Sequence, residues 1–175
     1  MPKREKTVTS VQPRILEIDN HAKVSQVLKG IAGKADLSWY SEEVAKTARH
    51  WLRLGMHHLV VSRRLISKPQ DWRSAVSRCY YAAYNVSKCV RYCINGCVRF
   101  DGGDHKLVGD LPNDFPDRAS WSAFLAELRQ DRNFADYEPW TRTRFRLSHS
   151  PGESIGRVQV FTKESKVCLR KKGWA

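Results

Sequence analysis

The strongest pattern in this chain is a helical apolar stripe over residues 71–97. Apolar side chains recur there at intervals of three and four residues, so they share one side of an α-helix. The stripe consists of Trp72, Ala75, Val76, Cys79, Ala83, Val86, Val90, Ile94 and Cys97. Asp71 is suited to cap the start of this helix, and Asn95-Gly96 is suited to end it. So long an apolar side must be covered by other elements, which favours a helical bundle.

Helical patterns precede this stripe. A weak pattern covers residues 15–33 and begins after Asp19-Asn20. A stronger pattern starts at Ser41, a capping residue type, and ends before Pro69, because proline disfavours helix in the residue before it.

Loop and helix alternate in the second half of the chain. Residues 98–117 hold five aspartates, three glycines and two prolines, which predicts a loop with one helical turn near residues 105–108. Asp117 or Ser120 opens the next helix, and Pro139 ends it. A last helix is predicted over 153–170, although the run VQVF at 158–161 leaves a short strand as an alternative.

These elements predict an all-α fold, a bundle of four or five helices. Residues 1–40 are expected to form a basic N-terminal extension with a short helix. Residues 41–170 are expected to form the helical domain, and residues 171–175 a basic C-terminal tail.

Positive charge is concentrated at the two ends of the chain, whose net charge is +13. Residues 1–14 contain four basic side chains and one acidic, and residues 139–175 contain nine basic and two acidic. The centre, residues 15–138, contributes only +3. Basic ends on a near-neutral body favour a polyanionic partner such as RNA or DNA. Solubility alone is the alternative explanation.

Composition excludes several classes of protein. Hydrophobic residues form 41% of the chain, which is typical of a globular protein rather than a disordered one. No apolar run is long enough to span a membrane, and the N-terminus MPKREKTVTS lacks an apolar signal segment. A cytoplasmic, reducing location is therefore expected, with the five cysteines as thiols.

The helix over 71–97 has a second side that is neither fully apolar nor simply polar. This side consists of Arg78, Tyr81, Asn85, Lys88 and Tyr92. Tyrosine and arginine are enriched at subunit interfaces, and tyrosine rings also pack within bundles. Packing, a subunit interface and a ligand-binding surface all remain open for it.

Arg132 is misplaced by the rules for a helical core. Within the stretch LRQDRNFADYEPW (128–140) it falls inside the apolar stripe of Trp121, Leu125, Leu128 and Ala135. The guanidinium can extend to the surface, or it can form an ion pair with Asp136 or Asp131. It can also be functional, held in a costly position to meet a phosphate or a transition-state charge.

A metal site is the less favoured explanation for Cys89, Cys93 and Cys97. These thiols recur every four residues, and His57-His58 offers nitrogen ligands. However, zinc sites of recognisable sequence pair close cysteines across a turn, and free cysteine is usually a small buried side chain. No motif of an activated serine, a phosphate-binding glycine loop or a zinc protease is present, and DGGD at 101–104 is an acidic turn.

Two stretches in this order, SRCYYAAYNVSK (77–88) and RNFADY (132–137), resemble the HEPN superfamily of small helical domains. The first is similar to a bacterial branch that carries A-x-x-R-x-YYAA-[FY], matched by Ala75, Arg78, Tyr80, Tyr81, Ala82, Ala83 and Tyr84. The second is similar to the ending R-x-x-ADY of that branch, matched by Arg132, Ala135, Asp136 and Tyr137. His105 matches a loop histidine that precedes the third helix of the branch. The resemblance covers residues 41–170.

The resemblance implies an antiparallel four-helix domain that forms a homodimer. Many members are metal-independent ribonucleases of toxin–antitoxin or phage-defence systems, often encoded beside a nucleotidyltransferase antitoxin. Their two active sites meet at the dimer interface and use an arginine followed, after four to six residues, by a histidine. In such an enzyme the histidine moves a proton of the reacting hydroxyl or leaving group, and the arginine offsets charge on the phosphate.

This chain departs from that signature, because Tyr137 stands where a histidine is expected after Arg132. The spacing occurs elsewhere, at Arg14–His21, Arg53–His58, Arg99–His105, Arg142–His149 and Arg144–His149. Arg144–His149 lies just after the motif helix and is one substitute. Alternatively, His105 approaches Arg132 from its loop, with Tyr137 as a partner.

Two hypotheses follow. In the first, the protein cleaves RNA as a toxin or phage-defence effector, with Arg132 on the scissile phosphate and Asp136 orienting it. In the second, a non-catalytic module binds RNA, a nucleotide or a partner protein in the same place. The candidate catalytic residues are Arg132, Asp136, Tyr137 and His105. The candidate substrate-binding residues are Arg78, Tyr81, Asn85, Arg142, Arg144 and His149. No metal or cofactor is expected.

Overall fold

The protein is an all-α bundle, described by a computed structural model over residues 18–32, 38–138 and 146–174. Within these ranges lie five α-helices and two short 3-10 helices, and no strand beyond a single bridge. The elements are α2 (His21–Ala32), α3 (Ser38–Leu65), η1 (Pro69–Asp71), α4 (Trp72–Asn95), η2 (Gly102–Leu107), α5 (Arg118–Tyr137) and α6 (Pro151–Lys171). The predicted fold class is confirmed. The VQVF run lies inside α6, so the alternative strand was wrong.

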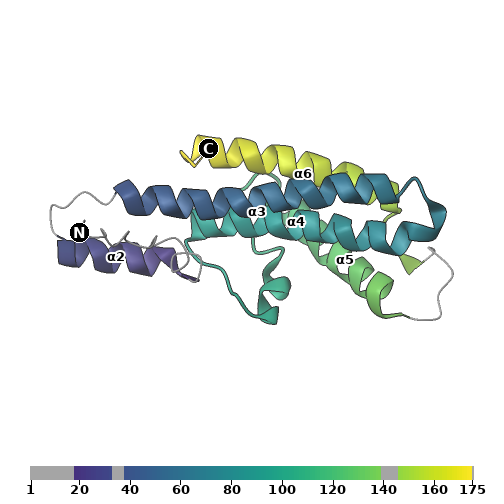
Figure 1. Ribbon diagram of the computed structural model, residues 1–175, viewed down its shortest axis with the longest axis horizontal. Helices are drawn as coiled ribbons and strands as arrows, with labels where there is room; N and C mark the ends of the chain where they lie inside the picture. The colour runs from purple at the N-terminus through teal and green to yellow at the C-terminus, as the bar shows by residue number, and fades with distance from the viewer. Residues whose placement is uncertain (1–17, 33–37, 139–145, 175) are drawn as a thin grey trace, which may run out of the picture.

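Helix α4 is the central element of the bundle. It contacts α3, α5 and α6, and α3 also contacts α6. Figure 1 shows α3 and α4 running side by side in opposite directions, with α5 and α6 continuing the alternation. The short α2 lies at one end of the molecule, and η2 projects from the long loop between α4 and α5 (Figure 1).

The apolar stripes predicted from the sequence form the core. In α4, Trp72, Val76, Cys79, Ala83 and Val90 are all buried, whereas Cys97 beyond its end is exposed. The stripe of α5 is buried as well, through Trp121, Leu125, Leu128 and Ala135. Helices α3 and α6 complete the core with side chains such as Val44, Val158 and Phe161.

Helix boundaries differ from prediction by a few residues. Helix α3 begins at Ser38 rather than at Ser41, because Tyr40 lies one turn before Val44 and is buried with it. The predicted capping by Asp71 is not seen, since its side chain makes no cap hydrogen bond. Gly96 ends α4 with a left-handed backbone, φ 75°, as its position predicts.

The N-terminal ends of the last two helices are built differently. Helix α5 starts after Asp117, but this residue has φ 46° and no capping side-chain bond. Helix α6 starts at Pro151, two residues before the predicted start. Ser150 accepts from the backbone N–H of Glu153, and the Glu153 carboxylate accepts from the N–H of Ser150. This reciprocal capping box fixes where α6 begins.

Helix α2 is attached to the end of α4. The backbone N–H of Ala22 donates to Gly96, and that of Val98 donates to Asp19, with an antiparallel bridge between Asn20 and Cys97. The side chain of Asn20 accepts from the N–H of Lys23 and caps α2, as the sequence suggested. No described helix is long and apolar enough to cross a membrane.

Helices α3 and α4 approach most closely at Gly55. An alanine Cβ at this position would lie 2.9 Å from the carbonyl oxygen of Ala82 and 2.9 Å from Cγ2 of Val86. We expect Gly55→Ala to lower the free energy of unfolding by about 1–3 kcal/mol, measured by urea denaturation, because the two backbones must separate.

Gly156→Ala in α6 is the matched control, since no heavy atom lies within 4 Å of its Cβ position. There, the better helix propensity of alanine should raise the free energy of unfolding by about 0.5–1 kcal/mol. If the two substitutions change the free energy of unfolding by the same amount, the close approach of α3 and α4 at Gly55 has no effect on stability.

Candidate functional site

Three tyrosines of α4 and one histidine of η2 form the centre of a polar and aromatic cluster. The hydroxyl of Tyr80 lies 2.8 Å from Nδ1 of His105. The imidazole of His105 stacks on the ring of Tyr84, with centroids 4.3 Å apart, and meets the ring of Tyr81 edge-on at 6.0 Å. The residues His105, Tyr80, Tyr81 and Tyr84, together with Arg132, are called the Tyr–His–Arg cluster below.

Arg132 enters this cluster from α5. Its Nη2 donates to the hydroxyl of Tyr81 at 2.7 Å, and its Nε lies 2.7 Å from Oδ2 of Asp136, one helical turn along. The guanidinium also lies over the rings of Tyr80, Tyr81 and Tyr137 at 5.2–5.9 Å. Of the two carboxylates considered from the sequence, Asp136 is therefore the partner.

Asp131 has a different role. It is buried, and its Oδ1 accepts from the backbone N–H of Ser148 at 2.8 Å, which ties α5 to the start of α6. The carboxylates at 131 and 136 thus lie on different sides of α5, one toward α6 and one beside Arg132.

Neighbouring tyrosines connect the histidine to the arginine. Tyr80 contacts His105 through its hydroxyl, and the next residue, Tyr81, accepts from Arg132. The sequence hypothesis that His105 approaches Arg132 from its loop agrees with this arrangement. The exposed ring of Tyr137 contacts Arg132 and makes no described contact with His105.

A buried ion pair holds η2, and hence His105, against α4. Both oxygens of Asp104 accept from Arg91, with Nη1–Oδ1 at 3.0 Å and Nη2–Oδ2 at 2.8 Å. Asp104 also accepts from the backbone N–H of Arg99, and Nζ of Lys88 lies 3.7 Å away. Asp104 is 0% and Arg91 2% exposed, so this pair is fully removed from solvent.

The ammonium group of Lys88 occupies an aromatic surround next to the cluster. It lies 5.1–5.6 Å from the ring centroids of Trp51, Tyr84 and Phe100, and it donates to the carbonyl of Arg99. Burial lowers the pKa of Lys88, against the opposing charge of Asp104. Lys88 contacts Tyr84 at its hydroxyl, to which Nζ donates at 3.5 Å.

Electrostatics favour a neutral His105 and a charged Arg132. Burial lowers the pKa of His105, and the nearby Arg132 guanidinium lowers it further. Burial raises the pKa of Tyr80, so this phenol stays protonated at neutral pH. Burial alone would lower the pKa of Arg132, but Tyr81 and Asp136 outweigh it and raise the pKa overall.

A basic hollow of about 300 Å³ adjoins Asp136. Arg73, Ser74, Ser77 and Arg78 of α4 line it together with Ala135 and Asp136 of α5. Arg73 donates to the carbonyl of Ala135 at 2.7 Å and so joins α4 to α5 beside the hollow. Arg73, Arg78 and Ser74 offer donors to a phosphate in this hollow, while Ser77 donates to Asp136, whose carboxylate opposes an anion there.

The candidate substrate-binding residues are not all in one place. Arg78 is exposed and lines the hollow, and Tyr81 belongs to the cluster. Asn85 is buried, and its amide donates to the carbonyl of Tyr81 within α4, so it braces the helix instead of facing solvent. Tyr92 is buried against His21 and Trp51.

His149 lies on the α6 side of α5. Its Nε2 is 2.9 Å from a carboxylate oxygen of Glu127 and 3.0 Å from Nη1 of Arg157, and its ring lies near Phe124. None of its described contacts involves the Tyr–His–Arg cluster. Arg142 and Arg144 lie outside the described residues.

Tyr80, Tyr84 and Lys88 were noted in the sequence without a role in positioning His105, and Arg91 was not singled out. Tyr80, Tyr84, Lys88 and Arg91 follow one another at helical spacing, and each contacts Asp104 or His105 of η2. This spacing was a usable signal, because a charge at Arg91 on a helix buried all round requires a partner. The DGGD turn supplies that partner in Asp104.

The cysteines are free thiols, and Cys89 and Cys93 are buried in α4. In the described ranges, no group of three or more His, Cys, Asp or Glu side chains is arranged to hold a metal ion.

Comparison of the chain with protein-family models, with curated proteins and with solved structures found no match.

Proposed function

We propose that this protein binds and cleaves single-stranded RNA at the Tyr–His–Arg cluster, without a metal ion. The observation that carries the proposal is the pair of contacts on adjacent residues, Tyr80 to His105 and Tyr81 to Arg132. These contacts bring an imidazole, which can transfer a proton, and a guanidinium, which can offset charge on a phosphate, into one cluster. The resemblance to HEPN ribonucleases supports the same conclusion.

Nε2 of His105 is the atom available to RNA, because Nδ1 is engaged by Tyr80. When the phenol donates to Nδ1, Nε2 carries the ring proton and can donate to a phosphate oxygen. When Nδ1–H donates to the phenol oxygen instead, Nε2 is a base. The lowered pKa keeps the neutral, basic form available at neutral pH.

The reaction follows from this second arrangement. Nε2 takes the proton of a ribose 2′-hydroxyl, the 2′-oxygen bonds to phosphorus, and the bond from phosphorus to the 5′-oxygen breaks. The imidazolium returns its proton to the leaving 5′-oxygen. The products are a 2′,3′-cyclic phosphate and a 5′-hydroxyl, and Arg132 offsets the charge that develops on the phosphate.

Surrounding charge supports an RNA substrate. The hollow lined by Arg73 and Arg78 offers a place for an adjacent phosphate. The chain as a whole carries a net charge of +13, which favours association with a polyanion. A homodimer, and control by a nucleotidyltransferase antitoxin, belong to the same proposal through the resemblance alone.

The test is incubation of purified protein with single-stranded RNA in the presence of EDTA. We expect cleavage with cyclic-phosphate ends, and we expect Arg132→Ala to slow it about 10²- to 10³-fold through lost charge stabilisation. Arg64→Ala, which removes the same charge from an exposed position in the last turn of α3, is the control and should change the rate little. Intact RNA with wild-type protein would overturn the cleavage proposal.

A second candidate function is RNA binding without cleavage. It is favoured by the fact that Arg132 already uses its nitrogens on Asp136, Tyr81 and Asn133. A guanidinium whose nitrogens already contact three side chains holds those side chains in place more than it stabilises the charge that develops on a phosphate during cleavage. In this case wild-type protein would retard RNA in gel-shift experiments, Arg132→Ala would weaken that retardation, and no product would form.

A further inference from the structure

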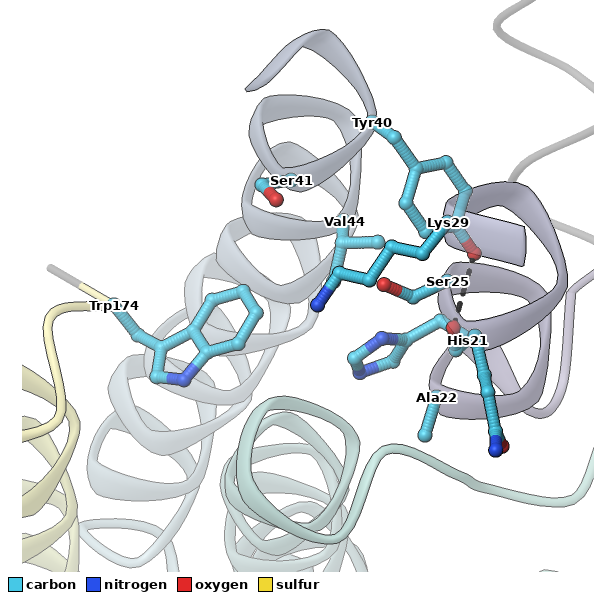
Figure 2. A pocket seen from close by; sticks show the side chains of 9 residues that line it. His21, Ala22, Ser25, Lys29, Tyr40, Ser41, Val44 and Trp174 are labelled. Atoms are coloured by element: carbon cyan, nitrogen blue, oxygen red, sulfur yellow. Dashed lines mark hydrogen bonds between the residues drawn. The ribbon is translucent and has the colours of Figure 1, made fainter. Parts of the chain in front are cut away.

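A second cavity, far along the bundle from the hollow at Asp136, lies between α2, the start of α3 and the C-terminal end of the chain (Figure 2). Its volume is about 380 Å³, within the size range of small-molecule sites. Tyr40 and Val44 of α3 form one wall and Trp174 another, while His21, Ser25 and Lys29 of α2 close the third side.

Trp174 is placed in this wall by the end of α6. Gly173 adopts a left-handed backbone, φ 78°, and the N–H of Trp174 then donates to the carbonyl of Leu169 at 3.0 Å. The chain therefore turns back, and the indole lies 6.0 Å from the ring of His21. An aromatic face held in this way is suited to stacking a planar ring.

His21 presents a hydrogen-bond acceptor. Its Nε2 lies 2.5 Å from the carbonyl oxygen of Tyr92, which can only accept, so Nε2 carries the proton. Burial lowers the pKa of His21, against the raising effect of that hydrogen bond. The ring is therefore neutral, and Nδ1 keeps a lone pair that a ligand N–H can satisfy.

Lys29 supplies positive charge. Figure 2 shows its side chain extending across the cavity toward Trp174. No carboxylate is among the described residues that line the cavity, and no described residue pairs with the Lys29 ammonium. The hydroxyls of Ser25 and Ser41 add donors on the same walls.

We propose that this cavity binds a planar heteroaromatic ligand that carries both an N–H donor and an anionic group. The ring stacks on Trp174, its N–H donates to Nδ1 of His21, and the anion pairs with Lys29. A nucleoside monophosphate and an aromatic carboxylate both have this chemistry. The site is separate from the Tyr–His–Arg cluster, so the inference does not depend on the proposed cleavage of RNA.

Calorimetric titration of the full chain tests the proposal, with AMP and indole-3-acetate as the two ligand sources. We expect at least one to bind with a dissociation constant below about 1 mM. For AMP, adenosine and ribose 5-phosphate should each bind about tenfold more weakly, because each lacks one recognised group. Binding of indole-3-acetate alone would identify the ligand class as an aromatic carboxylate.

Two variants and a control assign the binding to this cavity. Lys29→Gln should weaken the anionic ligand about tenfold without changing adenosine, and Trp174→Leu should weaken both. Lys23→Gln removes an exposed lysine of the same helix that does not line the cavity, and it should change nothing. No saturable binding of either AMP or indole-3-acetate, or binding that neither Lys29→Gln nor Trp174→Leu weakens, would overturn the proposal.

Discussion

Asp104→Ala is expected to lower the free energy of unfolding by about 3–5 kcal/mol, the largest change of stability among the substitutions considered. The variant leaves the guanidinium of Arg91 buried without its bidentate partner, and it leaves the ammonium of Lys88 with one opposing charge fewer. The backbone N–H of Arg99 also loses its acceptor. Urea denaturation followed by circular dichroism measures the change.

Two further variants separate a buried charge from a general loop effect. Asp101→Ala removes an exposed carboxylate of the same turn that pairs with Arg99 and caps η2 by accepting from the N–H of Gly103. It should therefore lower stability, but by less than Asp104→Ala, because only an exposed ion pair and a cap are lost. Arg91→Met combined with Asp104→Leu removes both charges of the pair and should recover part of the lost stability, while Lys88 and the N–H of Arg99 still lack Asp104. If Asp104→Ala is as mild as Asp101→Ala, the buried pair does not hold η2.

The same carboxylate predicts how stability depends on pH. Burial raises the pKa of Asp104, but the hydrogen bonds and charge of Arg91 outweigh burial and hold the pKa at about 2, below the ordinary value of 3.8. A lowered pKa means that the stabilisation is fully present above about pH 4 and is lost as the pH falls toward 2. Asp104→Asn should lack this part of the acid loss that wild-type protein shows.

His105→Ala should reduce the rate of RNA cleavage by about 10²- to 10⁴-fold, the range for loss of a proton-transferring group. The substitution removes Nε2, the one atom of the cluster able to take and return a proton near neutral pH. Cleavage rates are measured under single-turnover conditions, so that binding does not obscure the chemical step.

His149→Ala is the matched comparison, because the Arg144–His149 spacing offers the competing histidine. Its side chain contacts Glu127 and Arg157 rather than the cluster, so cleavage should be retained. For wild type, the acid limb of the pH–rate profile should have its midpoint below 6.5, since the pKa of His105 is lowered. If His149→Ala loses cleavage and His105→Ala retains it, the active site lies at His149, just before α6.

The spacing of apolar residues in the sequence was sufficient to predict the helices and which side of each is buried. The apolar stripe from Trp72 to Val90 is the buried side of α4, because residues three and four positions apart lie on the same side of a helix. Starts of helices were less predictable. Ser41 and Asp71 are good capping types, yet tertiary packing of Tyr40 and the 3-10 turn at Pro69 decided where α3 and α4 begin.

Pairings across the bundle were the hardest part to anticipate. The Arg132–Asp136 pair is local, one turn apart, and its spacing is visible in the sequence. The Arg91–Asp104 pair and the contact of Tyr80 with His105 depend on how the loop of residues 96–117 folds back, which no periodicity encodes. The cavity beside Trp174 depends in addition on the turn at Gly173.

The close pairing of α3 with α4 has a consequence for the order of folding. These helices are joined by a short connection at residues 66–71, so their contacts close small loops and are expected to form early. The hairpin of α3 and α4 contains Tyr80, Tyr81 and Tyr84, whereas His105 and Arg132 lie in η2 and α5, which follow it in the chain. If the cluster cleaves RNA as proposed, a chain that ends before α5 is expected to lack that cleavage.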